Sequence, residues 1–158
     1  IQLAYSCISC AQPQQQQENI WSKELIGIWQ VKQKKRYKRP DSIITLPRKK
    51  RYLILSPEGT YRYDYNRIRR RYKKRKMYGL WKYDSIEKGV IFQRKLSRLD
   101  VYNFDRIGLE YVKINKHYYV KYFIEHILEL NKRQLILYDE SHDTVHIYER
   151  VAPFSTND

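Results

Sequence analysis

Apolar and polar residues alternate one by one along most of the chain from Gly27 onward. In the stretch GIWQVKQ, Trp29 and Val31 are separated by a polar residue, and in TYRYDY every second residue is a tyrosine. A repeat of two is typical of a β-strand with one buried face, because successive side chains point to opposite sides of the strand. The pattern therefore predicts an antiparallel sheet.

Short turn sequences separate the alternating stretches at intervals typical of β-hairpins. They are SPEG at 56–59, EKG at 87–89, NKR at 131–133 and ESHD at 140–143. Eight or nine strands are expected, over residues 27–38, 43–55, 60–67, 77–84, 89–96, 108–115, 117–130, 134–139 and 144–150. A sheet of this many strands removes its exposed edges by closing. We therefore predict an all-β fold, a single antiparallel up-and-down β-barrel.

The longest expected strand covers residues 117–130. One of its faces would carry Tyr118, Val120, Tyr122, Ile124, His126, Leu128 and Leu130. We expect His126 to be a core or cavity histidine rather than a metal ligand. Residues 19–26 are expected to form a helical turn or a short helix, and no other helix pattern of useful length is evident.

The first residues differ from the rest in composition. Residues 1–11 are apolar and end in small side chains, which resembles the tail end of a bacterial export signal. Residues 12–23 begin with a glutamine-rich tract that has nothing to bury and is expected to be a solvated tether. The barrel domain is expected over residues 24–151, followed by a disordered tail at 152–158.

Two processing routes fit the cysteine pair near the start, Cys7 and Cys10. Ile8-Ser9-Cys10 resembles a lipoprotein box, which predicts lipid attachment at Cys10 and an envelope anchor. Alternatively, Ser9-Cys10-Ala11 is a small-x-small site, with cleavage before Gln12 and secretion. A plain disordered start also stays open. A redox CxxC is disfavoured, because that motif is typical of a βαβ context.

Charge is concentrated in one part of the chain. Residues 32–76 contain 19 basic and 3 acidic side chains, a net of +16, while the remainder has a net of −1 and the whole chain +15. Such asymmetry indicates a surface feature that suits a polyanion on an otherwise neutral domain.

The centre of that basic block is the run RIRRRYKKRK at 67–76, which falls where a hairpin is expected to turn. Three interpretations stay open. The run is a solvated hairpin tip, or it binds an anionic surface such as lipid head groups or polysaccharide. In the third, it grips single-stranded nucleic acid, with Tyr72 and Tyr78 stacking on bases. The candidate anion-binding residues are Arg69, Arg70, Arg71, Lys73 and Lys74.

A Gly-x-Trp motif, Gly27-Ile28-Trp29, opens the first strand, and the last strand ends in Tyr148-Glu149-Arg150. Together with the strand rhythm and a second Gly-x-Trp at 79–81, this resembles the lipocalins and the bacterial lipocalin-like domains, which are calycin-type β-barrels. The resemblance covers about residues 24–151. It implies a barrel base closed by Gly27, Trp29 and Arg150, with the guanidinium over the indole, a contact worth about 0.5–2 kcal/mol.

Several aromatic residues are candidates for lining a ligand cavity. Flat aromatic walls with hydroxyl partners suit a small apolar ligand, and an eight-stranded barrel either fills its interior or holds one such ligand. The tentative ligand-binding residues are Tyr61, Tyr63, Tyr65, Trp81 and Tyr122. The alternative is that they only pack the core or stand on the surface.

Signatures of catalysis are missing. The sequence has no Gly-x-Ser-x-Gly, phosphate-binding glycine loop or His-Glu-x-x-His. We expect no catalytic residues, no metal and no cofactor. The sequence therefore predicts a non-catalytic, monomeric lipocalin-like protein, lipid-anchored in a bacterial envelope or secreted. It would bind a small apolar ligand or an anionic surface, and a nucleic-acid-binding barrel is the alternative.

Overall fold

A computed structural model describes residues 21–44, 50–65 and 77–152 of the chain, and side chains are described for all but a few of these. Residues 21–25 are helical and lead directly into the first strand. The elements that follow are β1 (Gly27–Arg36), β2 (Ile43–Ile44), β3 (Arg51–Leu55), β4 (Thr60–Tyr65), β5 (Met77–Asp84), β6 (Gly89–Leu96), α2 (Arg98–Ile107), β7 (Tyr111–Ile114), β8 (His117–Val120), β9 (Phe123–Leu130), β10 (Gln134–Asp139) and β11 (Thr144–Ala152).

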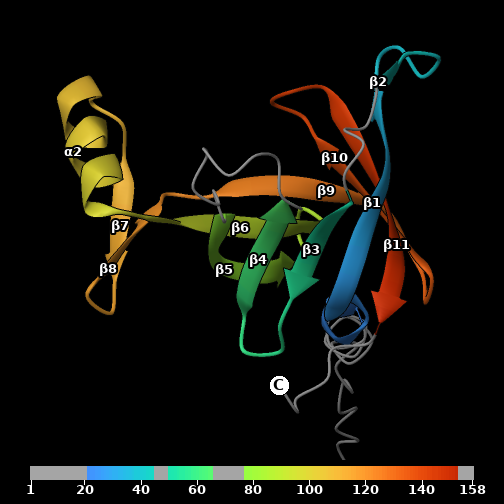
Figure 1. Cartoon of the computed structure of the whole chain (residues 1–158), viewed down its shortest axis with the longest axis horizontal. Coiled ribbons are helices and arrows are strands. Elements are labelled where there is room, and N and C mark those ends of the chain that lie inside the picture. The colour runs from blue at the N-terminus through green and yellow to red at the C-terminus, as the bar shows by residue number, and fades with distance from the viewer. Residues whose placement is uncertain (1–20, 45–49, 66–76, 153–158) are drawn as a thin grey trace, which may run out of the picture.

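Eight of these strands form a closed antiparallel barrel (Figure 1). Their order is β5, β4, β3, β1, β11, β10, β9 and β6, and the β5–β6 pairing closes the ring. Every neighbouring pair is antiparallel, including the first and last strands, β1 and β11. The predicted all-β, up-and-down barrel is therefore confirmed, and the short strand β2 pairs with β1.

The base of the barrel is closed around Trp29, which is completely buried. Its indole Nε1 donates a hydrogen bond to the Leu25 carbonyl, 2.8 Å away. The Arg150 guanidinium lies over the Trp29 ring, 4.2 Å from its centroid. Arg150 also donates to the carbonyls of Ile26 and Glu24, so it joins the last strand to the segment that precedes the first.

The core continues from this base along the inward face of each strand. Because inward positions recur with a period of two, β3 contributes Leu53 and Leu55 while β10 contributes Leu135 and Leu137, all of them buried. The alternation seen in the sequence is thus the alternation between barrel interior and solvent.

The connection between β6 and β9 contradicts one sequence-based expectation and shortens a second predicted element. We expected no useful helix there, yet α2 spans ten residues. A strand was expected over 108–115, but the structure has only Tyr111–Ile114, paired with β8. Residues 97–122, called the arm below, extend away from the barrel (Figure 1).

The helix has clear end signals. Ser97 and Asp100 form a reciprocal capping box, and Gly108 ends the helix in the left-handed conformation at φ 70°. No residue of α2 is buried, so the helix adds nothing to the barrel core.

The expected strand 117–130 is also wrong as one element. It divides into β8 and β9, which pair with different parts of β6. The interruption at residues 121–122 changes which side chains face inward: Ile127 is buried, whereas Tyr122 and Leu128 are exposed. The expected strand 43–55 is described only at its two ends, as β2 and β3.

Candidate functional site

A cavity of about 970 Å³ lies inside the barrel, toward the end of β1 remote from Trp29. Its apolar walls are aromatic and aliphatic side chains from β3, β4, β6, β9 and β11. Tyr61 and Phe92 meet edge to face, with ring centroids 5.0 Å apart. Phe92 and Phe123 are stacked at 5.3 Å. This volume falls in the range of small-molecule sites.

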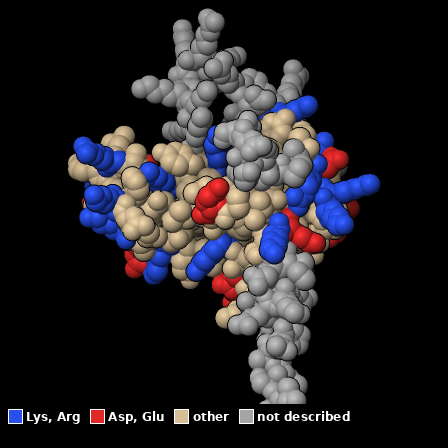
Figure 2. Space-filling model, turned by 90° about the horizontal axis from the view of Figure 1, so that it is seen from below, with Lys and Arg blue, Asp and Glu red and all other residues tan. Residues whose placement is uncertain are grey.

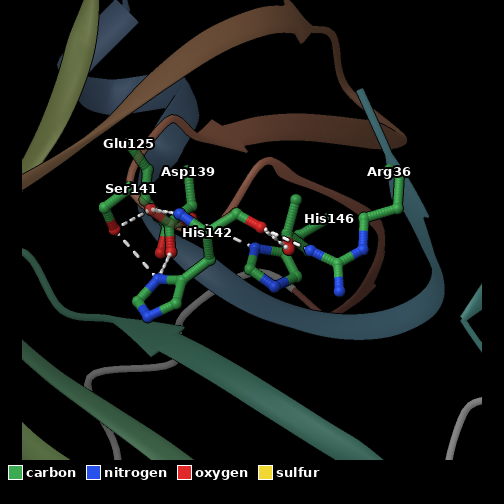
Figure 3. Close-up of polar contacts among 7 residues, drawn as sticks. Arg36, Glu125, Asp139, Ser141, His142 and His146 are labelled. Atoms are coloured by element: carbon green, nitrogen blue, oxygen red, sulfur yellow. Dashed lines mark hydrogen bonds and ion pairs between the residues drawn. The ribbon is translucent and has the colours of Figure 1, made fainter. Parts of the chain in front are cut away.

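Two ionisable side chains from neighbouring regions of the wall meet inside the cavity. Glu125 on β9 and His146 on β11 each keep 12% of their side-chain surface exposed, and Glu125 Oε2 lies 3.4 Å from His146 Nδ1. These two facing atoms are closed to solvent and form no hydrogen bond among the described residues. Figure 3 shows both side chains beside the β10–β11 turn.

Lys34 on β1 lines the same cavity. Burial and the positive charge of Arg51 lower the pKa of the Lys34 amine, while the charges of Glu125 and Asp139 act in the opposite direction. The amine is therefore desolvated and lies within electrostatic reach of both carboxylates.

The rim of the cavity is the β10–β11 turn, which carries a compact polar cluster (Figure 3). His142 Nδ1 lies 2.7 Å from Asp139 Oδ2, and the Ser141 hydroxyl donates to Asp139 Oδ1 over 2.6 Å. Burial of Asp139 disfavours its charge, but the hydrogen bonds from Ser141 and His142 outweigh burial and lower its pKa. The Arg36 guanidinium donates to the His142 carbonyl and fastens the turn to β1.

The Ser141, His142 and Asp139 side chains do not form a nucleophilic triad. In such a triad the carboxylate and the hydroxyl contact opposite ring nitrogens of the histidine. Here the Ser141 hydroxyl lies 2.9 Å from Nδ1, the same nitrogen that faces Asp139. The geometry is that of a turn held by its own side chains.

Only some of the candidate ligand-binding residues line the cavity. Tyr61 and Tyr63 line the cavity. The side chain of Tyr65 lies outside the described residues. Trp81 is not at the cavity: it is 8% exposed, and its indole donates to the Ser56 carbonyl in the core.

Tyr122 is a second correction. It is 58% exposed and does not line the cavity, because the chain is interrupted just before β9 and the inward positions shift. For the same reason His126 points to the outside of the barrel, where its Nδ1 lies 3.2 Å from the Glu87 carbonyl oxygen.

The structural residues Gly27, Trp29 and Arg150 lie together at the base, as described above. Cys10 and the candidate anion-binding residues between 69 and 74 lie outside the described residues. Among the basic side chains that Figure 2 shows, some cover the arm and others the barrel, and they do not gather in one patch on that face.

Sequence reasoning missed Lys34, Glu125 and His146. A signal for His146 was present, since it alternates with Thr144 and Tyr148 in the strand TVHIYER. The signal for Glu125 was hidden by the interruption before β9. Lys34 was hidden by the irregularity between Val31 and Gln33, which returns a charged residue to the inward face.

Comparison with solved structures identifies the class of fold. The chain is similar to a lipocalin-like protein from Bacteroides uniformis, with a TM-score of 0.51 and 14% identity over 80% of this chain and 98% of the other. It is also similar to an uncharacterized protein from Bacteroides eggerthii, with a TM-score of 0.50 and 10% identity over 79% and 98%. The fold is therefore a lipocalin-like β-barrel.

No protein-family model matches the sequence, and no curated protein is significantly similar to it. The structural likeness shows the fold, and it lends no support to nucleic-acid binding. Within the described ranges, no helix is long and apolar enough to cross a membrane. No group of three or more metal-ligating side chains comes together in that same part of the chain.

Proposed function

We propose that this protein is a non-catalytic binder of a small, mainly apolar ligand, held inside the barrel. The observation that carries the proposal is the cavity, with its aromatic floor and polar rim. Burying an apolar surface there is favoured by about 25 cal/mol per Å². The polar rim would orient the ligand, as a few polar groups do in most small-molecule sites.

A neutral fluorescent probe tests this function. N-phenylnaphthylamine brightens when it leaves water for an apolar site, so titration with the purified protein should give a saturable increase in fluorescence. Leu53→Trp places a larger side chain in the cavity wall. It should weaken probe binding at least about tenfold, which corresponds to about 1.4 kcal/mol.

Ile54→Trp is the matched control, because Ile54 is the next residue of β3 and points to the opposite side. It should bind the probe like the wild type. Thermal unfolding of both variants verifies that they are folded. Absence of saturable binding in the wild type, or equal loss in both variants, would contradict the proposed function.

We also propose that the protein acts outside the cytoplasm and is anchored through Cys10. The Ile8-Ser9-Cys10 motif and the glutamine-rich segment after it support this. Palmitate labelling and membrane pelleting of the full-length gene product should both disappear in Cys10→Ala. A Cys7→Ala control should keep them, and an unlabelled, exported wild type would leave simple secretion instead.

Binding to an anionic surface is a second candidate function. The observation that favours it is the net charge of +16 between residues 32 and 76. Vesicles of phosphatidylcholine with phosphatidylglycerol should sediment the protein at low salt, whereas pure phosphatidylcholine should not. Replacing Arg69, Arg70, Arg71, Lys73 and Lys74 by serine should reduce sedimentation and leave the midpoint of unfolding nearly unchanged.

A further inference from the structure

We infer that the cavity selects an uncharged apolar molecule that carries a hydroxyl group, and that this hydroxyl binds to the Glu125–His146 pair. The inference rests on the proposed ligand-binding function and names the chemical class of the ligand. Three features of the described residues carry it.

The first feature is the unused hydrogen-bonding capacity of the pair. Glu125 Oε2 and His146 Nδ1 face each other at 3.4 Å and are closed to solvent. Both side chains line the cavity, and neither forms a hydrogen bond within the described residues through its remaining polar atom, Glu125 Oε1 or His146 Nε2. A carboxylate oxygen only accepts hydrogen bonds, so the missing partner of Glu125 is a donor.

The second feature is the charge of the wall. The formally charged side chains that line the cavity are Lys34, Arg36, Glu125, Asp139 and Asp143. Two are positive and three negative, so their formal sum is −1. An anionic ligand would add to this negative excess in a partly desolvated site.

A ligand ammonium group is disfavoured by the groups that already surround Glu125. The Lys34 amine already interacts electrostatically with the Glu125 carboxylate. His146 already lies beside Glu125 Oε2. A ligand carboxylate would instead lie beside the charge of Glu125 itself. A hydroxyl group donates to Glu125 Oε1 without adding charge.

The third feature is the position of the pair relative to the apolar walls. Glu125 follows Phe123 by two residues on β9, and His146 precedes Tyr148 by two on β11. Residues two apart share one face of a strand, and all four side chains line the cavity. The His146 and Tyr148 rings have centroids 6.1 Å apart. A ligand with its hydroxyl at the pair would therefore place its apolar body against aromatic rings.

Displacement of N-phenylnaphthylamine by matched dodecyl compounds tests this inference. Dodecanol should displace the probe at a concentration at least about tenfold lower than dodecyl methyl ether. The ether has the same oxygen but no hydrogen-bond donor. The difference is expected because a hydrogen bond to a charged group contributes about 1.5–3 kcal/mol. Dodecanoate and dodecylamine should also displace it less well than dodecanol. The compounds are compared below their critical micelle concentrations.

Variants of Glu125 and His146 test whether these two side chains cause the preference for dodecanol. Glu125→Leu should abolish the preference for dodecanol over the ether, and Glu125→Gln should keep part of it, because the amide oxygen still accepts. Glu129→Leu is the matched control, since Glu129 is an exposed residue of the same strand, and it should keep the full preference. His146→Leu should weaken the preference, and His117→Leu, at an exposed position of β8, should not.

Each outcome separates the head-group inference from the proposed function. Probe binding with equal affinity for dodecanol and its ether would overturn the inference and leave ligand binding standing. So would a preference for dodecanoate or dodecylamine, or a dodecanol preference that survives in Glu125→Leu. Failure of the wild type to bind the probe or any dodecyl compound would overturn both.

Discussion

Arg150 connects parts of the chain that lie far apart in sequence. Its guanidinium covers Trp29 and donates to Ile26, 124 residues earlier. Burial lowers the pKa of Arg150, while the charge of Glu24 acts in the opposite direction. Two backbone carbonyls and the indole ring of Trp29 compensate the Arg150 guanidinium for this partial loss of water.

A double-mutant cycle tests this contact. Trp29→Ala should cost about 3–5 kcal/mol of stability, because it removes a fully buried indole. Arg150→Ala should also destabilise the fold, and the double variant should be less than additive by about 0.5–2 kcal/mol. Urea denaturation measures all four proteins, and clean additivity would show that the two side chains act independently.

Asp139 gives the stability a dependence on pH. Its folded-state pKa lies below the ordinary value of 3.8, so its contribution is present above that value and is lost as pH falls through the folded pKa. Asp139→Asn should therefore flatten the decrease in melting temperature between about pH 5 and pH 2. An unchanged slope in Asp139→Asn would contradict the assignment.

At the scale of elements, most strands could be predicted and the arm could not. Each strand of the barrel has one face in the interior, so inward-facing residues recur at every second position of its sequence, as Tyr61 and Tyr63 do. Helix α2 buries no residue and was not predicted, although its apolar and polar residues are partly segregated. Its ends could have been read from Ser97, Asp100 and Gly108.

The candidate site was predictable only in part, for a related reason. Tyr61 and Tyr63 follow the regular alternation, whereas Lys34, Phe123 and Glu125 follow interruptions of it. Interruptions depend on how neighbouring strands pair, which a single strand's sequence does not specify.

Two glycines should respond very differently to alanine. A Cβ at Gly79 would lie 2.0 Å from the Gln93 carbonyl oxygen, so Gly79→Ala should separate β5 from β6 and cost at least about 3 kcal/mol. Gly108 has free space but a φ of 70°, so Gly108→Ala should cost about 1 kcal/mol, confined to the arm. Denaturation curves measure both, and similar effects would contradict the assigned close approach.

For the whole molecule, the barrel and the arm are expected to be separable. β6 and β9 pair directly from Gly89 with His126 to Phe92 with Phe123, so the ring closes without the arm. Replacing residues 97–122 by a short glycine–serine linker should leave a cooperatively unfolding barrel that still binds N-phenylnaphthylamine. A control linker in place of β10 should abolish folding, and loss of folding in the arm variant would show that the arm supports the barrel.

The pairing of β1 with β11 also has a consequence for the order of events during protein synthesis. Strand β1 leaves the ribosome long before its neighbour β11, so the ring stays open until β11 has been made. Contacts between such distant segments slow folding. Until then β1 has an unpaired edge, which is a site for association with other chains. We therefore expect the nascent protein to be most prone to association with its copies in the interval between synthesis of β1 and of β11.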